Sequence, residues 1–445
     1  MRRIAARRAW SFASLKVEGW AVIVSENAPS IEVPIQRGPR RRAELVGKRV
    51  GLPTVLLERL ALFAIVLRVF MMIAWSPIAT ASPELSALKL CYLSDALVMA
   101  VCILILFVRA GRWGVIGCLV LALGVTVMYL SAELSHSDSL MIDLLVVFTV
   151  SFVEPRRLCK TYAIVALISI VIVMLLSMTG AIIMREFIPN GRLVFAYGFG
   201  HPNTLGGLLL SALGALMYVY WDSRHWAISF VLAVVAAVFA KVTLSSNSAA
   251  ALLVIVAFAC FVGHIDATRS VVARLRRMWV PLLILAPTVL GLIMLLLTAN
   301  HGGYGILADI VDRLTHLRPS FANQYYVANG GFTLFGRPYV HSSTYHNGLG
   351  FAAVDSSYSY MSLVNGMVAL LACFVAYVVL VVRSRGKRVH PFAVAAILIY
   401  VVYGVVEGYP MYLHSNFTLL LLAGLGRTAL SRPTEIRRSP TGVNG

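Results

Sequence analysis

The sequence has few charged residues, and few of those are acidic. Charged residues make up 13% of the 445 residues, with 19 Asp and Glu against 38 Lys and Arg. So small a charged fraction leaves too little polar surface to cover a water-soluble core of this size. Hydrophobic residues reach 59%, and the mean hydropathy is +0.83. This composition excludes a soluble globular protein and indicates a membrane protein.

Three further patterns are missing. The 6 cysteines mostly lie inside apolar runs and show neither a disulfide framework nor a metal-ligand spacing. The N-terminal region lacks the charged, apolar and small-residue layout of a cleavable signal peptide. Blocks such as 163–178 are apolar on every side, unlike the alternating strands of a membrane β-barrel. We therefore expect an uncleaved first span and membrane helices.

Long apolar runs recur from Leu56 to Leu430. A bilayer core needs about 20 apolar residues per helix, and helices satisfy their own peptide groups in lipid. The sequence therefore predicts an all-α polytopic membrane protein with about twelve transmembrane helices. The predicted spans lie near 55–75, 88–108, 113–132, 139–153, 161–183, 204–220, 226–241, 247–264, 278–299, 358–382, 390–406 and 415–430.

The basic residues gather in the segments between alternate spans, which is the positive-inside pattern and does not indicate nucleic acid as a partner. This pattern predicts that both termini are cytoplasmic. Residues 1–53 and 431–445 are then cytoplasmic tails, the first of them strongly basic and suited to anionic lipid. The transmembrane domain covers 54–430. Two outer loops are expected, at about 184–203 and at about 300–357, and the second is the long extracytoplasmic loop.

Basic residues in those outer loops oppose the insertion bias. The loops hold Arg185, Arg192, Arg313, Arg318, His201, His316, His341 and His346. They either form a functional site or are the ordinary charge of long outer loops. Arg68, Asp95 and Asp143 lie inside spans, where an ionisable group needs a partner or water. These three either pair across helices, which we favour, or line a path for protons or substrate.

Two polar stretches suit an anionic ligand. Residues 197–204 lead through His201 and Pro202 into a helix, whose first peptide groups favour an anion. His201 either fixes this turn or contacts substrate. Residues 312–318 are spaced as one helical turn, which would put Arg313 beside His316 and Thr315 beside Arg318. Arginine side chains suit a phosphate or diphosphate because they stay charged and offer several donors.

The order of these motifs resembles the bacterial O-antigen and capsular polysaccharide polymerase family (Wzy-like), which is related to the O-antigen ligases. The matching pieces are Gly200-His201-Pro202-Asn203, Leu314-Thr315 to Arg318, Leu334-Phe335-Gly336, Asp355 with Tyr358, Asn365-Gly366, Tyr403-Gly404 with Glu407, and Asn416-Phe417. They cover about residues 195–420. The chain departs from the family at Thr243 to Asn247, where a Ser-Arg pair is usual, and at Leu317-Arg318, where Gly-Arg is usual.

The resemblance implies an enzyme of the bacterial cytoplasmic membrane that joins undecaprenyl-diphosphate-linked oligosaccharide repeat units at the outer face and releases undecaprenyl diphosphate. It implies membrane lipid as surroundings, a chain-length regulator and a flippase as possible partners, and no metal or other cofactor. Candidates for the catalytic base are His346, His316, His201 and Glu407, although Glu407 would equally serve as a salt-bridge partner. Candidates for binding the diphosphate or glycan are Arg192, Arg318, Arg313, Arg185, Asn203, Asp355 and Tyr358.

Two other functions are compatible with the sequence. A ligase would use the same donor and move the finished glycan to a different acceptor. A transporter or flippase would also have many spans and buried charges, but we find no clear internal repeat of the kind that such folds often show.

Overall fold

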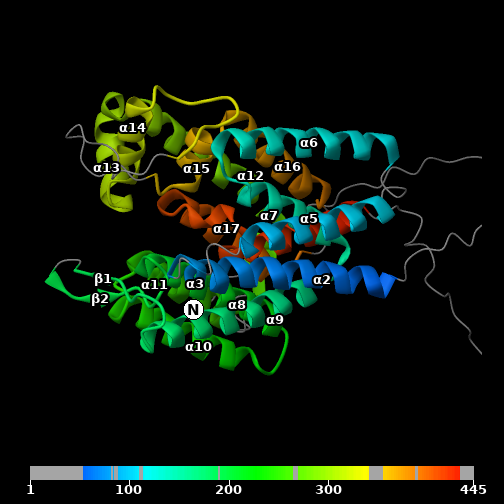
Figure 1. Ribbon diagram of the computed structural model, residues 1–445, viewed down its shortest axis with the longest axis horizontal. Helices are drawn as coiled ribbons and strands as arrows, with labels where there is room; N and C mark the ends of the chain where they lie inside the picture. Colours follow the sequence, from blue (N-terminus) through cyan, green and yellow to red (C-terminus); the bar gives the residue numbers. More distant parts are fainter. Residues whose placement is uncertain are drawn as a thin grey trace, which may run out of the picture. The chain divides into compact units, whose positions relative to one another are not determined.

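The computed structural model describes residues 54–81, 84, 89–109, 114–188, 191–263, 269–339, 354–385 and 389–430 (Figure 1). The basic tails at 1–53 and 431–445 lie outside the described residues. Almost all of the described chain is helical, and its strands form one two-stranded antiparallel sheet. The predicted all-α class is therefore confirmed.

The helices follow the apolar runs of the sequence. The first half contains α2 (Thr54–Phe70), η1 (Met71–Trp75), α3 (Ser76–Ala81), α5 (Leu90–Arg109), α6 (Gly114–Ser135), α7 (Ser139–Thr149), η3 (Val150–Phe152) and α8 (Pro155–Met178). After the hairpin of β1 (Glu186–Phe187) and β2 (Val194–Phe195) come α9 (Pro202–Tyr220), α10 (Trp226–Val242), α11 (Asn247–Gly263) and α12 (Arg269–Ala299). The remainder contains η6 (His301–Tyr304), α13 (Gly305–Thr315), α14 (Arg318–Ala328), α15 (Ser357–Tyr360), η8 (Met361–Asn365), α16 (Met367–Arg383), α17 (Pro391–Val406), η9 (Tyr409–Met411), η10 (Leu413–Ser415) and α18 (Thr418–Leu430).

Five of these helices are long and apolar enough to cross a membrane by length and composition. They are Leu90–Arg109, Cys118–Ser135, Pro155–Met178, Pro202–Tyr220 and Met278–Ala299. Shorter apolar helices accompany them, and helix is present in each of the twelve predicted segments. Many large apolar side chains on these helices are exposed, as a lipid-facing surface requires. The chain is thus a helical membrane protein.

A buried charge cluster ties α2, α5 and α7 together. The Arg68 Nε lies 2.7 Å from the Asp143 Oδ1, and its Nη1 lies 2.7 Å from the Asp95 Oδ1. Both Arg68 and Asp143 are fully buried. Burial of any one of these charges alone would cost several kcal/mol. The prediction that the three side chains pair across helices is confirmed.

The segment from Glu407 to Phe417 enters the bundle without forming a long helix. Its backbone is satisfied by side chains of other helices: the Leu413 N–H donates to the Asp143 Oδ2 at 2.8 Å, and the Phe417 N–H donates to the Ser211 Oγ at 2.9 Å. The Tyr162 hydroxyl donates to the carbonyl of His414 at 2.7 Å. Non-helical backbone is tolerated at such depth when protein groups supply its hydrogen bonds. This packing fixes where Glu407 lies.

The segment predicted as the long outer loop contains two helices, α13 and α14, and the single helical turn predicted over 312–318 is wrong. The α13 helix ends at Thr315, and His316 and Leu317 have left-handed backbone with φ of 54° and 65°. The Leu317 N–H donates to the Asp312 carbonyl, and α14 then starts at Arg318. Pro319 prefers the first turn of a new helix to the interior of a continuing one.

Backbone contacts fasten the end of this loop to the start of α16. The Arg337 N–H donates to the Val364 carbonyl at 2.9 Å, and the Met367 N–H donates to the Thr333 carbonyl at 2.9 Å. Gly336 and Gly366 face each other at this crossing, with φ of 105° and 93°. A Cβ on either glycine would overlap backbone atoms of the other segment. Both positions therefore require glycine.

Candidate functional site

Four segments that are far apart in the sequence meet around the Glu407 carboxyl. Asn203 lies in the first turn of α9, Arg318 is the first residue of α14, Asp355 precedes α15, and Glu407 follows α17. In Figure 1 the hairpin of β1 and β2 and the α13–α14 pair lie at the same end of the helices. We call the side chains of Asn203, Arg318, Asp355 and Glu407 the Glu407 cluster.

The Glu407 cluster is joined by ionic and neutral hydrogen bonds. The Arg318 guanidinium forms an ion pair with Asp355 through Nη1, and its Nη2 lies 3.6 Å from the Glu407 Oε1. The same Oε1 accepts a hydrogen bond from the Asn203 Nδ2 at 3.1 Å. The Glu407 carbonyl accepts from the Ser357 Oγ at 2.8 Å, which anchors the backbone. The carboxyl is thus contacted by Arg318 and Asn203, and the backbone of the same residue is anchored by Ser357.

Burial changes the acidity of Glu407. Its side chain is 6% exposed, whereas the side chain of its partner Arg318 is 18% exposed and that of Asp355 is 33% exposed. Loss of water raises the pKa of Glu407 to about 7, although the charge of Arg318 and the Asn203 hydrogen bond both oppose this rise. Arg318 is also shared with Asp355. One arginine facing two carboxyls favours a proton on one of them, and Glu407 is the more buried.

His201 stands beside the cluster as the N-cap of α9. Its Nδ1 accepts the Asn203 N–H at 3.1 Å, and its ring meets that of Phe187 edge to face at 5.0 Å between centroids. Desolvation of the ring, followed by the charge of Arg318, lowers the pKa of His201. The imidazole is therefore neutral, and because Nδ1 accepts, the proton is on Nε2. In this arrangement His201 fixes a turn and has no free accepting nitrogen with which to act as a base.

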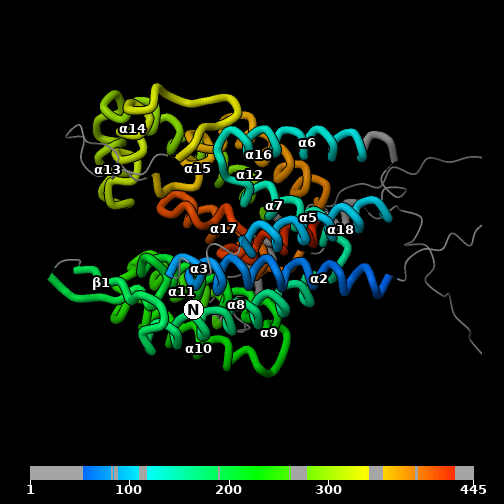
Figure 2. The backbone as a smooth tube through the Cα atoms, in the orientation of Figure 1, coloured from blue at the N-terminus to red at the C-terminus, as the bar shows by residue number. Residues whose placement is uncertain are grey.

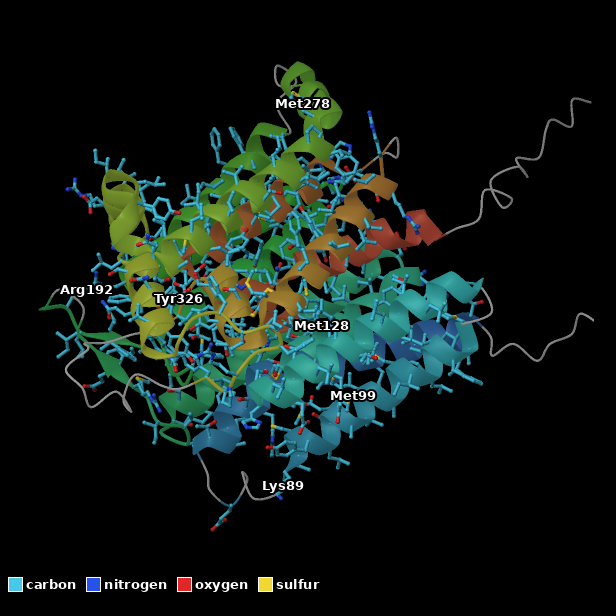
Figure 3. The ribbon with its side chains drawn as sticks, turned by 90° about the horizontal axis from the view of Figure 1, so that it is seen from above. Lys89, Met99, Met128, Arg192, Met278 and Tyr326 are labelled. Atoms are coloured by element: carbon cyan, nitrogen blue, oxygen red, sulfur yellow. The ribbon has the colours of Figure 1, made fainter. Side chains whose placement is uncertain are left out.

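The other predicted site residues that lie within the described ranges do not join this cluster. Arg185, Arg192, Arg313 and His316 are exposed. Arg192, labelled in Figure 3, donates through Nη2 to the Val242 carbonyl at the end of α10. Tyr358 donates to the Val401 carbonyl at 3.0 Å and packs on Gly291, so its contacts are those of helix packing. His341 and His346 lie outside the described residues.

Sequence reasoning missed two polar groups that support the site. The Tyr409 hydroxyl lies 2.8 Å from the Thr204 Oγ1 and joins the start of α9 to the segment after Glu407. Asp312 accepts the Ser320 N–H at 3.3 Å and contacts the His301 Nε2 at 2.7 Å, which holds the turn that presents Arg318. The helix break at Arg318-Pro319 was the signal for the second group. Nothing local marks Tyr409, because its partner is 205 residues away.

The geometry suits proton transfer from a bound hydroxyl group. A carboxyl with a pKa near neutrality can take a proton from a bound hydroxyl at neutral pH. Asparagine and arginine donors beside it can orient the oxygen that loses this proton. Within the described ranges, no group of three or more His, Cys, Asp or Glu residues is placed to hold a metal ion.

The fold and this cluster define a helical membrane protein with a polar site at one end of its helices. The chain matches no protein-family model, no curated protein and no solved structure. The resemblance of its motifs to the polymerase family therefore supports a proposal of function and does not establish the family.

Proposed function

We propose that this chain is a polysaccharide polymerase of the bacterial cytoplasmic membrane, with about twelve spans and both termini in the cytoplasm. It transfers a growing glycan from undecaprenyl diphosphate to the next lipid-linked repeat unit at the outer face. The observation that carries the proposal is the Glu407 cluster. It joins Asn203, Asp355 and Glu407, which belong to three of the resembling motifs, to Arg318 at the start of α14.

In the proposed reaction Glu407 is the general base. Its carboxylate takes the proton of an acceptor sugar hydroxyl, and the hydroxyl oxygen bonds to the anomeric carbon of the donor. The bond from that carbon to the diphosphate oxygen breaks, and undecaprenyl diphosphate leaves with both bonding electrons. The raised pKa of Glu407, to about 7, supports this role because a base works best near the ambient pH.

The leaving diphosphate needs positive charge. Arg318 is the cation nearest the base, but Asp355 and Glu407 already share it. Arg313 and Arg185 are exposed at the surface and have not been drawn into the cluster. We therefore assign Arg318 to orienting Glu407 and to contacting the diphosphate once Glu407 is protonated. Arg313, Arg185 and Arg192 remain candidates for the outer part of the diphosphate site.

Deletion of the gene, with the surface glycan displayed on a gel, tests the reaction class. A polymerase leaves single repeat units in place of a ladder, whereas a ligase leaves full-length chains on the lipid carrier. An unchanged glycan would overturn both the polymerase and the ligase and would favour a transporter.

A substitution then tests the site. Arg318→Ala should abolish chain growth at normal protein level, because the base loses its orienting cation. Arg385→Ala, which removes an exposed arginine outside the candidate site, is the matched comparison and should leave the ladder unchanged. A full ladder from Arg318→Ala would remove this residue from the site. If the enzyme depends on a chain-length regulator, removal of that regulator should abolish control of glycan length. If it depends on a flippase, removal of the flippase should stop the supply of donor.

A further inference from the structure

A cavity of about 320 Å³ lies where the start of α8 meets the end of α9 and the turn into α10. Its lining includes Arg156, Arg157, Lys160 and His225, together with Glu154. The α9 helix begins at the Glu407 cluster and runs for 19 residues, so this cavity is roughly 27 Å from that cluster along the helix axis. Figure 2 shows the β1–β2 hairpin and the turn from α9 into α10 at opposite ends of α9. The cavity is therefore a separate feature.

The positive charge of the cavity is only partly neutralised by nearby acids. Glu58 and Glu154 both pair with Arg157, at 3.2 Å and 3.6 Å. Arg156 uses its Nε to donate to the Val219 carbonyl at 2.9 Å, which holds the guanidinium against the end of α9. Lys160 is exposed one helical turn further along α8. Arg156 and Lys160 both line the cavity. Within the part of the chain that the structure describes, neither forms an ion pair with a carboxylate.

Apolar stripes lead from this cavity along two helices. On α8, Ile164, Ile168, Val171 and Leu175 are 45% to 56% exposed, and their spacing puts them on the face that begins with Arg157 and Lys160. On α10, an exposed stripe starts one turn after His225. It consists of Ile228, Val231, Val235, Val238 and Val242. Both stripes have the composition that acyl chains contact in a bilayer.

The two stripes flank α9. This helix packs against α8 on one side and α10 on the other. Its half-buried residues Leu209, Leu216 and Tyr220 share one face and lead down to the cavity. Apolar residues of α8, α9 and α10 therefore lead to a basic cavity. That combination matches a molecule with two parts, an acyl chain and a phosphate.

We infer that an anionic glycerophospholipid binds here, with the lipid phosphate in the cavity beside Arg156, Lys160 and His225 and the acyl chains along the exposed apolar stripes of α8 and α10. Phosphate is the shared chemistry of a lipid head group and a soluble phosphate ion. The apolar stripes favour the lipid. Basic pockets between membrane helices on the cytoplasmic side bind anionic head groups by this combination of contacts.

Native mass spectrometry of the full-length protein in neutral detergent tests the inference, with phosphatidylglycerol as the probe and phosphatidylcholine as the comparison. Lys160→Gln should weaken phosphatidylglycerol binding by about fivefold, since one cation near a lipid phosphate is worth about that factor. Arg224→Gln removes an equal charge from the same turn outside the cavity lining, and it should change nothing. The thermal unfolding midpoint of lipid-free Lys160→Gln should equal that of the wild type, because the side chain is exposed.

Three results would overturn the inference. Equal retention of phosphatidylcholine would remove the need for a charged head group. Equal weakening by Arg224→Gln and Lys160→Gln would show attraction by general surface charge. Displacement of the bound lipid by millimolar inorganic phosphate would assign the cavity to a soluble ion.

Discussion

Replacement of Glu407 by glutamine tests the electrostatics of the site without depending on the proposed reaction. Glutamine keeps the size of the side chain and an oxygen that can accept the Asn203 hydrogen bond. It removes only the ionisable group. Because burial raises the pKa of Glu407 to about 7 from an ordinary value of 4.5, the folded protein favours the protonated carboxyl.

The sign and size of the effect follow from linkage. A raised pKa in the folded state contributes stability that is fully present below pH 4.5 and is lost as the pH rises through 7. The difference between the two pKa values corresponds to about 3 kcal/mol. The wild type should lose about that much unfolding free energy over this range through Glu407 alone, whereas the Glu407→Gln variant should lose none of it.

Reversible unfolding in mixed micelles, measured for both proteins from pH 4.5 to pH 8.5, gives the comparison. Subtraction of the two profiles cancels the titrating groups that do not interact with Glu407 and leaves the contribution of Glu407 together with its coupling to Asp355 through Arg318. Glu186→Gln removes an exposed carboxyl from β1 and serves as the control, with a profile parallel to the wild type. Parallel profiles for Glu407→Gln and the wild type would refute the burial argument and the assignment of Glu407 as a base.

Two further predictions concern the packing that positions the site. Gly366→Ala should destabilise the protein by roughly 2–4 kcal/mol, because its Cβ would overlap the opposite backbone at a φ of 93°. Gly124→Ala, in the middle of α6 with nothing within 4 Å, should not lower the thermal unfolding midpoint, and equal losses would contradict the close-approach argument. Arg68→Ala should cost about 3–5 kcal/mol by leaving buried carboxylates unpaired. Addition of Asp143→Asn should recover part of that loss in the same unfolding assay, and no recovery would mean that the charge of Asp143 is not the cause.

Much of the fold could be predicted because the relevant signals are local. An apolar run of about 20 residues is helical in lipid whatever its neighbours are, since no other conformation satisfies its peptide groups there. Charge placement likewise drew attention to Arg318 as a cation in a predicted outer loop, whereas Glu407 was singled out by the resemblance of its motif. The prediction of one helical turn over 312–318 was wrong because it rested on the spacing of the charged residues. It did not take into account that Pro319 favours the start of a new helix.

The candidate site could be predicted only as a set of residues. The sequence contained Asn203, Arg318, Asp355 and Glu407 in separate short motifs, and it offered Arg185, Arg192 and Arg313 beside Arg318 as candidate ligands of the diphosphate. The structure brings Arg318 to Asp355 and Glu407 and leaves Arg185, Arg192 and Arg313 at the surface. It also shows that His201 uses its accepting nitrogen on its own helix.

The sequence alone determined that this is a helical membrane protein and where its long apolar helices lie, because hydropathy acts at each position separately. The cost of an isolated charge favoured pairing of Arg68, Asp95 and Asp143 but left a path for protons or substrate as the alternative. Only the tertiary structure decided which polar groups meet. Asn203 is 204 residues from Glu407, and their contact depends on how α9 and α17 pack and on the way the segment after Glu407 is held by Asp143 and Ser211. The raised pKa of Glu407 arises from the same packing, since the packing of these segments removes water from the carboxyl.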